Sequence, residues 1–168
     1  MSGRLRTKQQ APVEAVAAIL ENYANRAVFR GFSRGPARTG RAVFKMMWHR
    51  DRLFELLVDV PRKILRFPVV LPEIPARSDM YAELCDFVRS RQSEALPEHR
   101  RVDPAKTALR CGNKAGNVSL TAGVKDGDFE YAARKIVHLV HEIYMDFLMD
   151  GRYYDYLVET FNLDPDKM

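Results

Sequence analysis

Residues 41–60 read RAVFKMMWHRDRLFELLVDV, and apolar side chains recur at every second position on both sides of a polar break at Arg50–Asp51. This alternation predicts two antiparallel strands, because successive side chains of a strand point to opposite faces of the sheet. The break supplies the turn between them. We therefore expect a β-hairpin here, and the rest of the predicted fold is built around it.

The register of this hairpin follows from its apolar and charged positions. The apolar positions of both strands lie on one face when Met46 pairs with Phe54. The same register brings together two pairs of opposite charge, Lys45 with Glu55 and Arg41 with Asp59. Each such cross-strand pair contributes up to about 1 kcal/mol. The second face also carries the apolar residues Val43, Met47, Leu53 and Leu57. We expect a helix or a partner to cover part of that face.

Further strands are predicted on both sides of the hairpin. A short apolar segment at residues 27–32 indicates an additional strand before it. After it, the strand Ile64–Val70 places three apolar side chains on one face, Leu65, Phe67 and Val69. Pro68 cannot donate a hydrogen bond to a neighbouring strand, which predicts an edge or an end of the sheet there.

A second hairpin is predicted in the C-terminal half of the chain. Its strands are Thr107–Cys111 and Val118–Val124, separated by a turn over residues 112–117. Pairing Cys111 with Val118 aligns the apolar positions of the two strands. The predicted sheet therefore has about five strands, and the segment at residues 27–32 can add one more.

Four helices complete the pattern. Residues 1–10 are polar and predict a tail, followed by a single domain over residues 11–168. Apolar residues at helical spacing predict the helices Ala11–Tyr23, Asp79–Arg91, Phe129–Met149 and Tyr153–Phe161. Ser78 is the expected N-cap of the second helix. The third helix has the most regular apolar stripe, formed by Ala133, Ile136, Val140, Ile143 and Phe147.

The order helix, three or four strands, helix, two strands, helix, helix predicts an α+β domain, in which helices pack on one face of an antiparallel sheet. This order resembles that of the type III secretion chaperone-like fold and its YbjN-type relatives over residues 11–150. The resemblance implies a non-catalytic, often dimeric protein that binds other proteins. Because it lies in the order of the elements, no functional residues are carried over from it.

The composition is that of a globular protein. The chain has 168 residues, of which 46% are hydrophobic and 29% are charged, and this balance argues against a disordered chain. No apolar run approaches the roughly 20 residues of a membrane span. Cys85 and Cys111 show no zinc-ligand spacing and are expected to be reduced thiols. We expect no signal peptide and a cytoplasmic location.

Basic residues are concentrated in the first 70 residues, which carry 14 basic and 5 acidic side chains. They form either an anion-binding face or a set of charges that neutralises the acidic residues in the rest of the chain. The candidate anion-binding residues are Arg30, Arg34, Arg38 and Arg41. Four aromatic residues lie among them, Phe29, Phe32, Phe44 and Trp48. Arginines hold phosphates and aromatic rings stack on bases, so one interpretation is nucleic-acid binding. The other is a solvated face over a core.

The residues best suited to bind a metal ion are His138 and Glu142, which lie one helical turn apart. No second group of ligands accompanies them, and the string does not match the His-Glu-x-x-His pattern. We therefore expect no metal and no other cofactor, and interpret these residues as a polar helix face. The chain also contains no phosphate-binding loop and no acyl-transfer motif, which makes an enzyme the less favoured interpretation.

Aromatic residues crowd the C-terminus. Four of them are candidate partner-binding residues, Tyr153, Tyr154, Tyr156 and Phe161. Tyrosine suits an interface that is apolar at one end and wet at the other, while the alternative is that the last helix only covers the core. We expect a non-catalytic protein-binding domain of a chaperone-like or regulatory kind, which can include self-association into a homodimer. The alternative function is nucleic-acid binding through the Arg26–Arg52 region.

Overall fold

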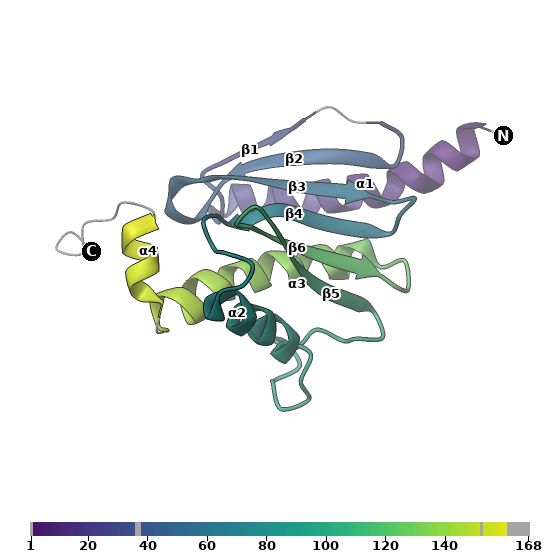
Figure 1. Ribbon diagram of the computed structural model, residues 1–168. Helices are drawn as coiled ribbons and strands as arrows, with labels where there is room; N and C mark the ends of the chain where they lie inside the picture. Colours follow the sequence, from purple (N-terminus) through teal and green to yellow (C-terminus); the bar gives the residue numbers. More distant parts are fainter. Residues whose placement is uncertain (1, 36–37, 152, 161–168) are drawn as a thin grey trace.

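The domain is a six-stranded antiparallel sheet with helices, seen in a computed structural model that describes residues 2–35, 38–151 and 153–160 (Figure 1). The strands are β1 (Gly31–Arg34), β2 (Arg41–Met47), β3 (Leu53–Asp59), β4 (Ile64–Leu71), β5 (Thr107–Lys114) and β6 (Asn117–Val124). The helices are α1 (Ser2–Asn25), α2 (Asp79–Ser90), α3 (Phe129–Glu142) and α4 (Tyr154–Thr160). The strand order is β1-β2-β3-β4-β6-β5. The predicted α+β class is confirmed, with six strands in place of about five.

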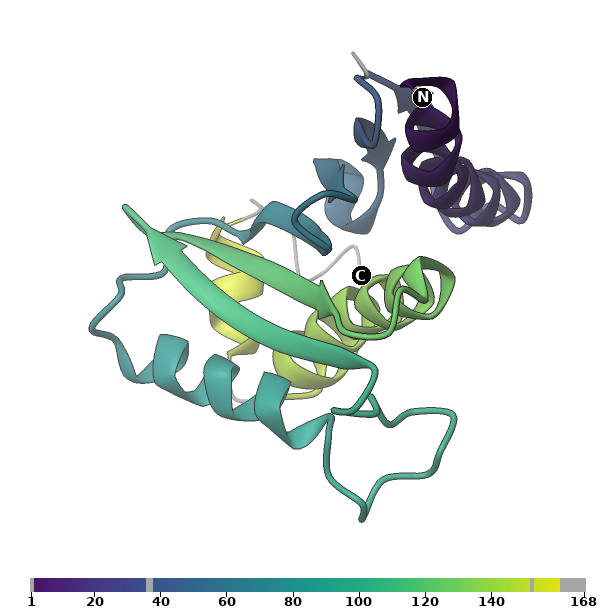
Figure 2. The ribbon, with the colours of Figure 1, turned by 90° about the vertical axis from the view of Figure 1, so that its right-hand side faces the viewer.

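The core lies between one face of the sheet and the helices. The two views of the ribbon place α1 and α3 together on this face (Figures 1 and 2), and α2 packs beside β5, the last strand. Alternate residues of the central hairpin are buried there, Ala42, Phe44 and Met46 on β2 and Phe54, Leu56 and Val58 on β3. None of the described helices packs on the opposite side of the central hairpin, which we call the open face.

The predicted register of the central hairpin is confirmed. β2 and β3 are antiparallel, and Met46 lies opposite Phe54. Both predicted ion pairs form on the open face, Lys45–Glu55 at 3.8 Å and Arg41–Asp59 at 3.5 Å. An extra strand was indicated at residues 27–32. The strand that forms is β1, which lies further along the chain, at Gly31–Arg34, and pairs with β2 at the edge of the sheet.

Pro68 predicted an edge or an end of the sheet, and the strand that carries it lies between two other strands. β4 pairs with β3 on one side and with β6 on the other. Pro68 is accommodated because the ladder to β6 is irregular between Phe67 and Leu71, and a proline needs no donor at such a bulge. The irregularity buries Val70 rather than Val69, which corrects the predicted inward face at this end of the strand.

The β5–β6 hairpin is longer than predicted. Its turn consists of two residues, Ala115 and Gly116, with positive φ angles of 53° and 88°. Two such residues form the hairpin turn whose twist matches that of the flanking strands. As a result, Cys111 lies opposite Leu120 rather than Val118. The predicted turn was too long, and the predicted pairing was therefore two residues out of register.

The first helix begins at Ser2, so residues 2–10, which were predicted to form a polar tail, continue α1 instead. Polar composition does not exclude a helix, because Lys, Arg and Gln have good helix propensity. Pro12 consequently lies inside the helix rather than in its first turn. The extension holds the loop before β2, where the Gly40 N–H donates to Gln10 Oε1 at 3.3 Å. Gly40 has a φ of +75°, and a Cβ there would lie 2.9 Å from a side-chain atom of α1.

The third helix changes its winding near its end. α3 ends at Glu142 and continues as a π-helical segment, η2 (Ile143–Met149), rather than as an α-helix. The predicted apolar stripe is confirmed as far as Ile143, but beyond it Tyr144 and Leu148 are buried while Phe147 is only half-buried. A π-helix has more residues per turn than an α-helix, and the inward face of η2 is therefore shifted by one residue.

Candidate functional site

The open face carries apolar side chains that the described part of the chain covers only in part. They are Val43 and Met47 on β2, Leu53 and Leu57 on β3, and Ile64 on β4. Leu53 is 53% exposed, and the other four are half-buried. Apolar side chains gathered on an exposed sheet face, among charged groups, are typical of a surface that binds a partner.

A hollow of about 400 Å³ lies on the open face, over β2, β3 and β4. Four arginines line it, Arg38, Arg41, Arg62 and Arg66. The lining also includes the apolar side chains of Val43, Leu57 and Ile64 and a single carboxylate, that of Asp59. We call this feature the arginine hollow. It combines an excess of positive charge with apolar surface.

The register of the sheet assembles the arginine hollow. Two cross-strand rows supply six of its residues, Val43–Leu57–Arg66 and Arg41–Asp59–Ile64. Two connections add the other arginines. Arg38 precedes β2 and exchanges two backbone hydrogen bonds with Arg41, both of 2.9 Å. Arg62 lies in the turn between β3 and β4, where its N–H donates to Asp59 Oδ1 at 3.1 Å.

Within the part of the chain that the structure describes, only two of these four arginines have an acidic partner. Arg41 Nε lies 3.5 Å from Asp59 Oδ1, and Arg62 Nε lies 3.9 Å from Asp59 Oδ2. The side chains of Arg38 and Arg66 are exposed and make no hydrogen bond or ion pair with any described residue. Each guanidinium has five N–H donors, so the hollow offers many more donors than acceptors.

The four arginines predicted to bind anions are not brought together by the fold. Arg38 and Arg41 line the arginine hollow, whereas Arg30 pairs with Asp51 at 3.0 Å in the turn after β2. Arg34 contacts α1, on the helix-covered side of the sheet. The other two arginines of the hollow come from β4 and from the turn before it.

Arg34 belongs to the framework of the domain. Its guanidinium donates two hydrogen bonds to Glu14 of α1, at 2.8 and 3.0 Å, and lies 5.6 Å from the centre of the Phe44 ring. These hydrogen bonds lower the pKa of Glu14 to about 2. A bidentate arginine–carboxylate pair has specific geometry, and this one joins α1 to β1.

The aromatic side chains of the basic segment are covered by the domain itself. Phe29, Phe44 and Trp48 are buried, and Phe32 is half-buried with its ring 5.9 Å from that of Phe44. Trp48 packs edge-on against Phe29 at 5.1 Å. These rings therefore do not lie beside the arginine hollow, where stacked bases would need them.

The tyrosines near the C-terminus pack against the protein's own core. The Tyr153 hydroxyl donates a hydrogen bond to Glu83 of α2, and that of Tyr156 donates to a backbone carbonyl. Tyr154 is half-buried. Phe161 lies outside the described residues. A role for these four residues in partner binding stays a prediction.

His138 and Glu142, the metal candidates, belong to an ion network. Glu142 Oε2 accepts hydrogen bonds from Arg91 at 2.8 Å and from Arg100 at 3.0 Å, and Oε1 lies 3.2 Å from His138 Nε2. Burial raises the pKa of Glu142, but these hydrogen bonds outweigh burial and lower it to about 2. The network ties α2 and the following loop to α3. Across the described residues, no group of three or more His, Cys, Asp or Glu is placed to hold a metal ion.

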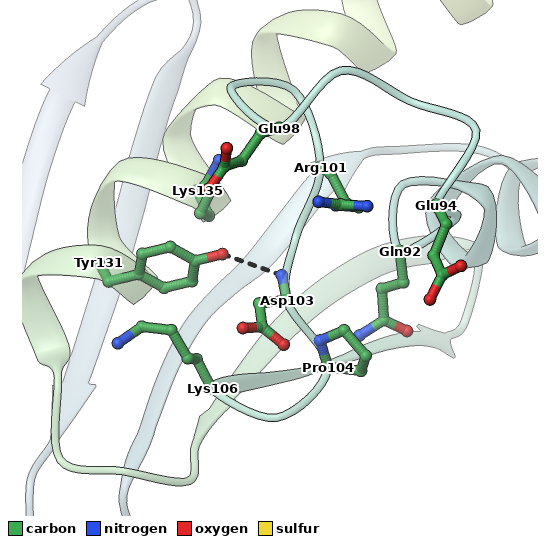
Figure 3. Close-up of a pocket in the computed structure, with 9 residues that line it drawn as sticks. All are labelled: Gln92, Glu94, Glu98, Arg101, Asp103, Pro104, Lys106, Tyr131 and Lys135. Atoms are coloured by element: carbon green, nitrogen blue, oxygen red, sulfur yellow. Dashed lines mark hydrogen bonds between the residues drawn. The ribbon is translucent and has the colours of Figure 1, made fainter.

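A second hollow, of about 420 Å³, lies between α3 and the loop over residues 91–106 (Figure 3). Tyr131 forms one wall, and its hydroxyl accepts a hydrogen bond from the Asp103 N–H at 2.9 Å. Charged side chains of both signs line the hollow, Glu94, Glu98, Arg101, Asp103, Lys106 and Lys135. Because these charges balance, the second hollow favours neither anions nor cations, and it is the weaker candidate site.

His49 is a half-buried titratable group on the helix-covered side. Its ring lies parallel to that of Tyr144, with centroids 4.5 Å apart, and its centroid is 5.3 Å from that of His141. Its Nε2 atom is buried and has no hydrogen-bond partner among the described residues. Burial, with the nearby positive charges of His141 and Arg50, lowers the pKa of His49 to about 3. The side chain is therefore neutral near pH 7.

Two arginines of the hollow were missed in the sequence, although the sequence contains a signal for each. Arg66 lies between Leu65 and Phe67, so the alternation of a strand already points it away from the core. Arg62 follows Pro61 in a turn that returns the chain beside Asp59. The prediction was based on the density of arginines before residue 52. It did not take into account which face of the sheet each strand residue occupies.

Comparison with protein-family models, with curated proteins and with solved structures found no match for this chain. Among the described helices, none combines the length and the apolar character needed to cross a membrane.

Proposed function

We propose that this protein is a non-catalytic binding domain that holds an acidic, partly apolar segment of another protein in the arginine hollow. The observation that carries the proposal is the pair Arg38 and Arg66, two exposed guanidinium groups without an acidic partner among the described residues, beside apolar strand residues. Such a lining is complementary to a segment in which carboxylates alternate with aliphatic side chains.

Physical chemistry favours carboxylates as the partner's charged groups. A guanidinium binds a carboxylate through two parallel hydrogen bonds, and such charge-assisted bonds are roughly twice as strong as neutral ones. The apolar lining, Val43, Leu57 and Ile64, gains stability by covering its surface with aliphatic groups of the partner. The positive charge of the hollow also increases the rate at which an acidic segment arrives.

Nucleic-acid binding through the same arginines is the alternative, and the surroundings of the hollow favour it less. The aromatic rings of the basic segment are packed on the helix-covered side. Strand faces that bind single-stranded nucleic acid instead present rings on which bases stack.

The test measures binding of a fluorescent peptide of alternating Glu and Leu by anisotropy. We expect the double variant Arg38→Gln/Arg66→Gln to weaken binding about tenfold or more, since two charge-assisted contacts are lost. The matched control is Arg30→Gln/Arg134→Gln, which removes the same charge from exposed positions elsewhere. We expect this control to change the affinity less than about twofold.

Two outcomes would overturn the proposal. Equal weakening by the control variant would show a response to net charge rather than to the hollow. Tighter binding of a single-stranded oligonucleotide than of the peptide, with an affinity that falls steeply as salt rises, would favour the nucleic-acid alternative.

A further inference from the structure

We infer that Asp59 acts as a built-in substitute for the partner's carboxylate, and that a bound partner replaces it at Arg41 and Arg62. The inference rests on the proposed function and adds a statement about its selectivity. Asp59 is the only acidic residue that lines the arginine hollow, among the described residues. Its side chain is 19% exposed, whereas those of Arg41 and Arg62 are 52% and 76% exposed.

The distances show that Asp59 holds its two arginines loosely. Its oxygens lie 3.5 Å from Arg41 Nε and 3.9 Å from Arg62 Nε, while a good N–H···O bond measures about 2.7–3.2 Å. The bidentate pair of Arg34 with Glu14, in the same protein, has contacts of 2.8 and 3.0 Å. Both arginines of the hollow can therefore form shorter bonds with an incoming carboxylate.

A backbone hydrogen bond holds the Asp59 carboxylate in its position. Its Oδ1 accepts a hydrogen bond from the Arg62 N–H at 3.1 Å, and this bond fixes the carboxylate at the start of the turn between β3 and β4. Asp59 also lies in a cross-strand row, between Arg41 and Ile64. The carboxylate is thus held in place, while a carboxylate on a partner can approach both guanidinium groups from solvent.

This arrangement sets how many carboxylates a ligand needs in order to bind tightly. Asp59 repels every anion that enters the hollow, and it already neutralises part of the positive charge of Arg41 and Arg62. A ligand with one carboxylate gains little beyond what Asp59 already supplies. A segment with several carboxylates can also engage Arg38 and Arg66. Asp59 therefore makes the hollow selective for densely acidic segments over isolated anions.

The experiment replaces Asp59 by Asn, which keeps an oxygen to accept the Arg62 N–H but removes the charge. We expect Asp59→Asn to bind the Glu-Leu peptide about three- to tenfold more tightly, because a like charge near the ligand is lost. The matched control is Glu55→Gln, which removes a carboxylate from the same face where it pairs with Lys45 at 3.8 Å. We expect that variant to change the affinity less than about twofold.

A third variant separates replacement at Arg41 from a general effect of charge. In the double variant Asp59→Asn/Arg41→Gln, the gain in affinity should be largely lost, because the released donor is absent. Asp59→Asn/Arg30→Gln has the same net charge but removes an arginine outside the hollow, and it should keep most of the gain. Thermal unfolding confirms that each variant is folded, and Asp59→Ser, which also offers an acceptor to the turn, replaces the asparagine variant if that one is unfolded.

The outcomes distinguish this inference from the proposed function. If Asp59→Asn binds the peptide no more tightly than the unchanged protein while Arg38→Gln/Arg66→Gln still weakens binding, the hollow binds the peptide and the role given to Asp59 is wrong. A gain that Glu55→Gln reproduces also overturns the inference. If the arginine variant has no effect, the proposed function itself fails.

Discussion

Replacement of Glu142 by alanine is expected to lower the free energy of unfolding by about 3–5 kcal/mol. Glu142 is 5% exposed and holds Arg91, whose side chain is 12% exposed. Without the carboxylate, the Arg91 guanidinium is left buried and unpaired, and an uncompensated buried charge is more costly than a lost contact. Arg100, in the loop after α2, loses one of the two carboxylates that it contacts.

Urea unfolding followed by circular dichroism measures this loss, since the midpoint and slope together give the free energy. Asp146→Ala is the matched control, because Asp146 is 43% exposed and contacts the same Arg100 at 3.1 Å. We expect that exposed carboxylate to contribute no more than about 1 kcal/mol. Equal losses for the two variants would show that burial of Glu142 does not matter.

The second large effect is a loss of stability in mild acid that depends on His49. Its pKa is lowered from 6.5 to about 3 in the folded protein, so the unfolded chain binds a proton more readily. Stability therefore falls as the pH drops below about 6.5, and continues to fall until the folded protein is also protonated near pH 3. Between pH 7 and pH 5 the expected loss from this group is about 2 kcal/mol.

His49→Phe tests this effect with little change of shape. A phenylalanine ring can keep the stacking with Tyr144 and His141, and no hydrogen bond of the buried Nε2 is lost because none forms with the described residues. Urea midpoints measured from pH 7 to pH 5 should fall much less for this variant than for the unchanged protein. Parallel pH profiles of the two proteins would contradict the assignment to His49.

The central hairpin could be predicted from sequence because two independent signals agree there. Alternation assigns each residue to a face, and the pairs Lys45–Glu55 and Arg41–Asp59 then select one register among those that alternation allows. The β5–β6 hairpin offers no such charge pairs. Its register depends on the turn, and the left-handed conformation of Ala115 is not evident from an alanine.

The arginine hollow could not be predicted as a unit, since it depends on geometry beyond single strands. Its residues come from three strands and two connections, and only the pairing of β3 with β4 sets Arg66 beside Leu57. The sequence showed that the second face of the hairpin is partly apolar. It did not show that Arg34 forms an ion pair with Glu14 while Arg38 stays exposed.

The position of α3 bears on the order in which the chain can fold during synthesis. Among themselves, β1 to β4 pair as consecutive neighbours, so these four strands can meet as soon as about 70 residues have left the ribosome. The face they present is nevertheless completed by α3, which begins at Phe129. For the time needed to translate some sixty residues, at about 5–20 residues per second, part of this face lacks its cover, including Phe54, whose ring packs against Tyr144 in the finished domain. A nascent-chain chaperone is expected to act in this interval.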